Sequence, residues 1–296
     1  MDLLQAWAHW KRNRAPYVLD SDQDTLISTR TAQKVTMVPS WPDAYRAEDF
    51  CVPKDHRLHF GLLPQPFCGD LCRASIYILL LNPGLSPSDY YGEHEVAAYR
   101  KALSANLKQK FRRGSPPFLF LDPQYSWHGG FDWWHGKLAG LIASLVKAWD
   151  VPWAEARGRL ARELASIELV PYHSANFALP DHVIRSLQSV KLARRFVLDK
   201  LVPRARSGDC LLVVTRAAKH WQLQEHRNIV VYSAAEARMA SLTPESRGGS
   251  AIRSFLQKRY GNCHLAEHGA PDPAIDFATA PTICQALSPT PEHCWS

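Results

Sequence analysis

The sequence predicts an α/β protein in which helices cover both faces of a central four-stranded, mostly parallel sheet, giving three α/β/α layers. Four short apolar runs are the candidate strands, at residues 75–81, 167–170, 210–215 and 229–232. Helical patterns separate the later runs, and strands that alternate with helices favour parallel pairing. The chain has 296 residues, of which 46% are hydrophobic. This is enough for one elaborated domain with a buried core.

The first candidate strand, 75–81, ends abruptly at the polar turn Asn82-Pro83-Gly84. Because the apolar run is short and bounded by turn residues, a buried strand is favoured over a buried helix. Ligands of open parallel sheets bind at the carboxyl ends of strands, so Asn82 stands where a functional site is expected. The alternative is an ordinary solvent-facing turn after a core strand.

The connection from the first strand to the second is long and must contain an insertion. Residues 85–136 are expected to be irregular or mixed, and helical patterns at 138–149 and 153–165 fill the rest. A helix is expected over 181–202, where Val183, Leu187, Val190 and Val197 recur on one face. Residues 217–224 can form only a short helix.

The chain divides into an N-terminal wrapping segment at 1–60, an α/β domain at 61–268 with the insertion at 85–136, and a C-terminal tail at 269–296. No signal peptide or apolar stretch of membrane-spanning length is evident, so a soluble, cytoplasmic protein is expected. The odd number of cysteines, seven, favours free thiols. Cys68 and Cys72 lack a second close pair, so neither a metal nor a cofactor is expected.

The segment 80–84 (LLNPG) and the order of the strands after it resemble the uracil-DNA glycosylase superfamily, over roughly residues 64–256. In that family the first strand ends in a water-activating motif, and this chain is similar to the branch with Asn-Pro-Gly, although Leu81 departs from the usual preceding residue. The family's second strand delivers residues that read a flipped base, and here 169–174 (LVPYHS) takes that place. The family's His-Pro-Ser motif is absent from 232–242. The resemblance implies a uracil-DNA glycosylase-like fold.

Cleavage of an N-glycosidic bond needs a placed water and a stabilised leaving base, because the sugar becomes oxocarbenium-like while the base departs with negative charge. Asn82 is expected to orient the water, and His173 to donate a hydrogen bond to the departing base. A structural His173 bonded to a backbone carbonyl is the alternative. Asp89 and Asp122 are the candidates for a general base, although most such aspartates cap a turn. No lysine stands in these motifs, so a monofunctional glycosylase that leaves an abasic site is expected.

The target base must leave the stack, and a flipped base needs aromatic walls. The insertion is dense in Tyr and Trp, for which a packed apolar subcore is the alternative. Gly84 leaves space where uracil-restricted relatives carry a Tyr, and residues 122–134 combine aromatic faces with polar groups that suit a sugar. We hypothesise that the base is a 5-modified cytosine, as excised by antiphage glycosylases of this superfamily that remove glucosylated hydroxymethylcytosine. Uracil or an oxidised pyrimidine is the alternative. The expected base-pocket residues are Pro83, Gly84, Tyr91, Asp122, Tyr125, Trp127, Tyr172 and Ser174.

Double-stranded DNA is the expected partner, which suits a formal net charge of +7 and a pI near 9.1. No membrane association is expected, and the protein is expected to act as a monomer. Met239 and Leu242 suit insertion beside an extruded nucleotide, and amides before a helix at 251–256 suit a phosphate. A non-catalytic DNA-binding protein is a further alternative, whereas a nucleotide-binding enzyme lacks its glycine-rich loop. The expected DNA-binding residues are Arg216, Lys219, Ser233, Arg238, Ser241, Leu242 and Arg247.

Overall fold

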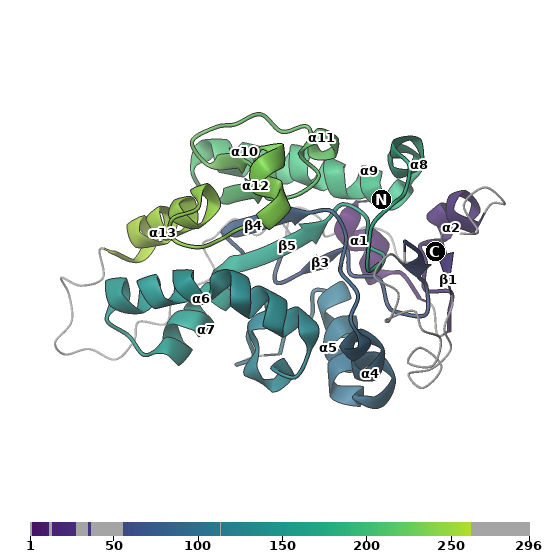
Figure 1. Cartoon of the computed structure of the whole chain (residues 1–296), viewed down its shortest axis with the longest axis horizontal. Helices are drawn as coiled ribbons and strands as arrows, with labels where there is room; N and C mark the ends of the chain where they lie inside the picture. The colour runs from purple at the N-terminus through teal and green to yellow at the C-terminus, as the bar shows by residue number, and fades with distance from the viewer. Residues whose placement is uncertain (1, 12–13, 28–34, 37–55, 113, 262–296) are drawn as a thin grey trace, which may run out of the picture.

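A five-stranded sheet with the order β3-β5-β4-β6-β7 forms the centre of the protein (Figure 1). The computed structural model describes residues 2–11, 14–27, 35–36, 56–112 and 114–261. The strands are β3 (Phe67–Cys68), β4 (Ile76–Leu80), β5 (Leu164–Glu168), β6 (Leu211–Val214) and β7 (Ile229–Val231). β4 pairs in parallel with β5 and β6, and β6 pairs in parallel with β7. Strands β1 (Val35–Thr36) and β2 (Leu58–His59) form a separate parallel pair.

The α/β class is confirmed, but the sheet has five strands instead of the expected four. The additional strand, β3, pairs antiparallel with β5, so the sheet is mixed. β3 could not be predicted, because a strand of two residues is too short to form a recognisable apolar run. β5 also begins at residue 164 rather than 167, because helix α7 (Trp153–Glu163) passes directly into it with no intervening loop.

Helices cover both faces of the sheet, and each buried strand therefore shows apolar side chains on both sides. Tyr77 and Leu79 of β4 face one layer, whereas Ile76, Ile78 and Leu80 face the other. The first layer contains α1 (Leu3–Ala8), α2 (Asp20–Ile27), α8 (Asp181–Ser186), α9 (Gln188–Phe196), α10 (Val202–Ser207) and α11 (Ala218–Trp221). The second contains α5 (Ala97–Leu107), α6 (Gly129–Trp149), α7 and α13 (Arg247–Tyr260).

Several predicted helices have different limits. The helix expected over 181–202 is broken at Leu187, and a π-helix, Val197–Leu201, joins α9 to α10. Helix α6 begins nine residues earlier than 138, because His128 caps it by accepting a hydrogen bond from Gly130 N at 2.9 Å. The insertion is mixed, which is one of the two expected alternatives. It contains α4 (Pro87–Glu95), α5 and the 3-10 turns Leu119–Leu121 and Pro123–Tyr125.

Part of the N-terminal segment packs into the core, where Leu3, Trp7 and Val18 are buried. Cys72 is disulfide-bonded, which corrects the expectation of free thiols, whereas Cys68 and Cys210 are free and buried. Within the described ranges, no helix is long and apolar enough to cross a bilayer. The tail at 269–296 lies outside the described residues.

Candidate functional site

Asn82 is held in one orientation by three acceptors. Its side-chain nitrogen lies 2.8 Å from Pro83 O, 3.2 Å from Tyr172 O and 2.9 Å from Ser174 Oγ. Backbone carbonyls only accept hydrogen bonds, so the atom facing them must be the NH2 group and not the amide oxygen. Asn82 Oδ1 receives no hydrogen bond from the described part of the chain. The half-buried side chain therefore presents a carbonyl oxygen that can accept from a water.

The turn after Asn82 is fixed by its neighbours yet open to solvent. Pro83 is buried, and its carbonyl also accepts from Ser174 N at 3.3 Å. Gly84 is exposed, and a Cβ added there would meet no atom within 4 Å. The space into which a side chain at position 84 would extend is therefore free of protein at its start.

His173 lies beneath this turn rather than facing solvent. Its Nδ1 lies 2.7 Å from Gly84 O, so Nδ1 carries the hydrogen, and its Nε2 is buried without a partner. Burial lowers the pKa of His173, so the ring is neutral near pH 7. The geometry matches the structural alternative, in which His173 holds the backbone of the turn.

Asp89, the first-turn acid of α4, lies between two histidines. Its Oδ1 is 3.4 Å from His128 Nε2 and 3.9 Å from His173 Nδ1, and its Oδ2 accepts from Ser86 N at 2.6 Å. Burial opposes ionisation, but His128, His173 and the Ser86 amide outweigh it and lower the pKa of Asp89. Asp89 is thus a buried anion that joins α4 to α6 and to the turn at Gly84.

The lowered pKa of Asp89 predicts a dependence of stability on pH. A carboxyl with a depressed folded-state pKa contributes stability above its unfolded pKa of 3.8, and that contribution disappears as pH falls through the folded value. Between about pH 5 and pH 3, the free energy of unfolding of the wild type should fall more steeply than that of Asp89→Asn. Urea denaturation at each pH measures this. Asp132→Asn, at an exposed site on α6, should keep the wild-type slope; equal slopes for Asp89→Asn would contradict the prediction.

Aromatic side chains of the insertion gather around His128, the histidine that lies 3.4 Å from Asp89. Tyr91 and Trp127 are 42% and 40% exposed and meet edge to face at 5.7 Å. Tyr125 is buried and packs against Tyr99, which stacks on His128 at 4.5 Å. Of the predicted aromatic walls, Tyr91 and Trp127 are therefore available to a ligand, whereas Tyr125 is buried against Tyr99.

Two predicted base-pocket residues have structural partners. Asp122 is the cap of the second 3-10 turn and accepts from Gln124 N at 3.0 Å. The Tyr172 hydroxyl donates to Asp22 Oδ2 at 2.8 Å in the opposite layer. Its backbone carbonyl, not its ring, faces Asn82.

Glu168 and Gln65 are site residues that the sequence reading missed. Glu168 ends β5 opposite Leu80, the last residue of β4, and its Oε2 is buried with no hydrogen-bond partner. The same is true of the side-chain nitrogen of Gln65. Glu168 could have been identified from the sequence, because it is an acidic residue inside the apolar run 167–170. Gln65 carries no comparable signal.

A basic surface surrounds Met239, which ends helix α12 (Ala234–Met239) and is 70% exposed. Arg216 donates to Arg238 O at 3.4 Å, and Lys137 donates to Met239 O. Leu242 is buried and therefore packs in the core instead of offering an insertion side chain. The sequence reading missed Lys137, which lies across the fold on α6.

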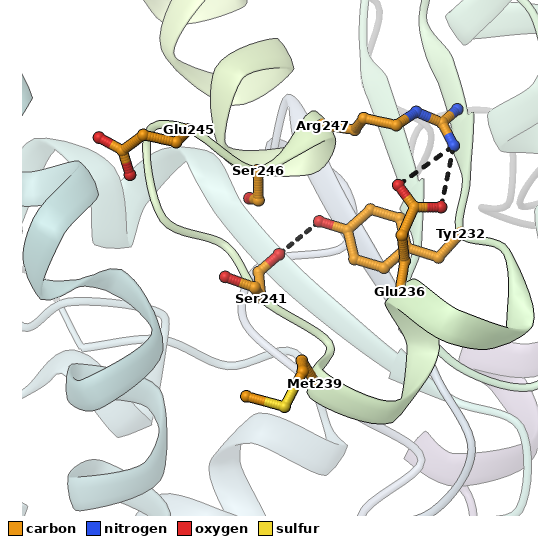
Figure 2. Close-up of a pocket in the computed structure, with 7 residues that line it drawn as sticks. All are labelled: Tyr232, Glu236, Met239, Ser241, Glu245, Ser246 and Arg247. Atoms are coloured by element: carbon orange, nitrogen blue, oxygen red, sulfur yellow. Dashed lines mark hydrogen bonds and ion pairs between the residues drawn. The ribbon is translucent and has the colours of Figure 1, made fainter.

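The other predicted DNA-binding residues are engaged locally. Lys219 pairs with Asp181 at 2.9 Å, and Ser233 caps α12. Arg247 pairs with Glu236, and the Tyr232 hydroxyl donates to Ser241 O (Figure 2). These residues line a hollow of about 270 Å³. This hollow contains none of the residues that bond Asn82.

The expected phosphate site before residue 251 is also corrected. Helix α13 begins at Arg247, and its first amides are occupied, because Gly248 N donates to the Tyr232 hydroxyl and Gly249 N donates to Ser246 Oγ.

Comparisons of the chain with protein-family models, curated proteins and solved structures found no match. Among the residues that the structure describes, no group of three or more His, Cys, Asp or Glu is placed to hold a metal ion. What the protein does must therefore be inferred from the geometry around Asn82.

Proposed function

We propose that this protein is a monofunctional DNA glycosylase, which flips a base out of DNA and hydrolyses its N-glycosidic bond. The orientation of Asn82 carries the proposal. Three acceptors hold its amide nitrogen, so its carbonyl oxygen is left to position an attacking water. Such a water needs placement more than activation when the sugar becomes oxocarbenium-like in the transition state.

The open side of the turn supports a base with a large 5-substituent. Gly84 presents no side chain beside Asn82, and the exposed rings of Tyr91 and Trp127 stand on the neighbouring insertion. Aromatic faces bind the apolar face of a sugar, so the proposed substrate is a glucosylated hydroxymethylcytosine of phage DNA. Excision of such a base would serve antiviral defence.

The direct test is incubation of the purified protein with a phage genome that carries glucosylated hydroxymethylcytosine and with an unmodified genome. Released bases are identified by mass spectrometry, and abasic sites are cleaved with alkali. Release from the modified genome alone supports the proposal. Release of uracil from a deaminated control, with the modified genome intact, would indicate a repair glycosylase. Binding to DNA without release of any base would indicate a non-catalytic binding protein.

Gly84→Tyr should narrow the substrate range. The backbone at Gly84 is not left-handed and a Cβ fits there, so the fold should tolerate the change while the ring fills the open space. Single-turnover excision of the glucosylated base should fall about tenfold or more relative to that of unglucosylated hydroxymethylcytosine. Gly84→Ala is the matched control and should retain the wild-type ratio. An unchanged ratio in Gly84→Tyr would contradict the expected location of the sugar.

Arg238→Ala should weaken DNA binding without sequence preference. Arg238 is exposed beside Met239, where a phosphate contact is expected. Loss of one such contact should raise Kd and reduce the slope of log affinity against log salt by about one. Fluorescence anisotropy with a labelled duplex at several salt concentrations measures both. Lys219→Ala should change neither, because Lys219 is already paired with Asp181.

A further inference from the structure

Glu168 is a buried acid with an unused oxygen at the carboxyl edge of the sheet. The residue is 9% exposed, and Oε2 has no hydrogen-bond partner. Glu168 pairs with Leu80, two residues before Asn82. Because paired residues point to the same face of a sheet, Glu168 shares with Leu80 the face on which Tyr99 and Tyr125 pack.

Two further unsatisfied groups lie on this side of the fold. The Gln65 side chain lies beside the Tyr99 hydroxyl, and both the Gln65 side-chain nitrogen and that hydroxyl are buried without a well-formed hydrogen bond. Pro66, which follows Gln65, accepts a hydrogen bond from Glu168 N at 2.9 Å. An unpaired buried polar group carries a desolvation cost. A polar ligand that paired with several of them would recover that cost.

Given the proposed glycosylase function, we propose that Glu168 is the general acid that protonates N3 of a departing cytosine, while the Gln65 amide donates to its O2. A carboxylic acid that has given its proton to N3 can then accept hydrogen bonds from both N3–H and the 4-amino group. Neutral cytosine is a far better leaving group than its anion. The edge that identifies cytosine would thus be the edge that activates it.

The step balances as a hydrolysis. The C1′–N1 bond breaks and its electron pair moves into the base, whose N3 takes the proton from Glu168. The water oxygen bonds to C1′, and the water gives up one proton to solvent. Glu168 regains a proton from solvent after the base has left.

This chemistry distinguishes cytosine from uracil. Cytosine N3 is a lone-pair acceptor, whereas uracil N3 already carries a hydrogen and cannot be protonated in this way. A neutral Glu168 therefore accelerates loss of cytosine derivatives, whatever their 5-substituent, and gives uracil no equivalent assistance.

The surroundings of Glu168 favour its protonated form. Burial raises its pKa well above the usual value for glutamate, although Arg216, the only charged group that acts on it among the described residues, partly opposes this. From β3, the Cys68 thiol adds no charge, because burial raises its pKa to about 12. A general acid must carry its proton at the working pH, as Glu168 would.

The test compares wild type, Glu168→Gln and the matched control Glu163→Gln at the opposite end of β5. The probes are duplexes that contain one glucosylated hydroxymethylcytosine or one uracil. Glutamine has nearly the shape of a neutral glutamic acid but has no proton to give. Single-turnover release of the modified cytosine by Glu168→Gln should fall about 10²–10⁴-fold, with Kd for the duplex and urea midpoint near wild type.

The pH profile separates an acid from a merely structural residue. The wild-type rate should fall as pH rises through the raised pKa of Glu168, whereas the residual rate of Glu168→Gln should lack this fall. Glu163→Gln should keep the wild-type profile even if its stability drops through the lost bond to Ser75. Release by Glu168→Gln within about threefold of wild type, or with an unchanged profile, overturns the inference alone. If the wild type releases no base, the proposed function itself fails.

Discussion

Replacing Asn82 with alanine is expected to lower the rate of base excision by about 10²–10³-fold. The amide nitrogen fixes the side chain through Pro83 O, Tyr172 O and Ser174 Oγ, and alanine removes the carbonyl oxygen that these contacts orient. Because the side chain is half-buried, the fold should survive its truncation. Single-turnover kinetics give the rate, and anisotropy with the same duplex should show Kd within about threefold of wild type.

Ser174→Ala is the matched control for Asn82. It removes one of the three acceptors and leaves two backbone carbonyls that still define the amide orientation. Excision should fall by less than about tenfold. If Asn82→Ala were as active as Ser174→Ala, Asn82 could not be the residue that positions the water.

Asp22→Ala is expected to lower the free energy of unfolding by about 3–5 kcal/mol. Asp22 is fully buried and accepts from the Tyr172 hydroxyl at 2.8 Å, from Gln188 N at 2.6 Å and from Ser189 N at 3.2 Å. Alanine removes the acceptor of all three donors, two of which, the Tyr172 hydroxyl and Ser189 N, are on buried residues. Urea denaturation followed by circular dichroism measures the loss, and excision should decline as well, since Tyr172 O also holds Asn82.

Asp24→Ala, at an exposed position two residues further along α2, should stay within about 0.5 kcal/mol of wild type. The free energy of unfolding of Asp22→Asn should lie between those of Asp22→Ala and Asp24→Ala, because the single carbonyl oxygen of asparagine can still accept from the α9 amides. A small effect of Asp22→Ala would mean that the N-terminal segment contributes little to the domain.

The strands that cross the core could be predicted from sequence because each is buried on both faces and reads as an apolar run. β3 could not, since two residues carry no periodicity. Leu187 ends α8 in an extended conformation, although its apolar spacing continues the helical pattern across the break. The start of α6 depends on a histidine cap, a residue type that sequence rules seldom place there.

Within the candidate site, the position of Asn82 just beyond the end of a buried strand could be predicted, because an apolar run precedes it. Asp89, named only as a possible base, proved to be an ion between two histidines because His128 arrives from 39 residues further along the chain. Tyr172 lies after β5 as expected, whereas Leu242, expected in a loop that begins at the end of β7, follows helix α12. The burial of both side chains depends on packing that local sequence does not encode. Lys137 lies beside Met239, and Gln65 lies in the interior, only because of how distant parts of the chain pack together, which local sequence does not show.

Gly92 leaves the space that the exposed aromatic pair, Tyr91 and Trp127, requires. A Cβ at this position on α4 would come within 2.8 Å of both Trp127 and Tyr99. Any larger residue would push Trp127 off the helix. Glycine at this position therefore indicates the aromatic pair. Sequences that share the Asn-Pro-Gly turn but carry a bulkier residue here should lack the pair. Such proteins should also differ in the bases they accept.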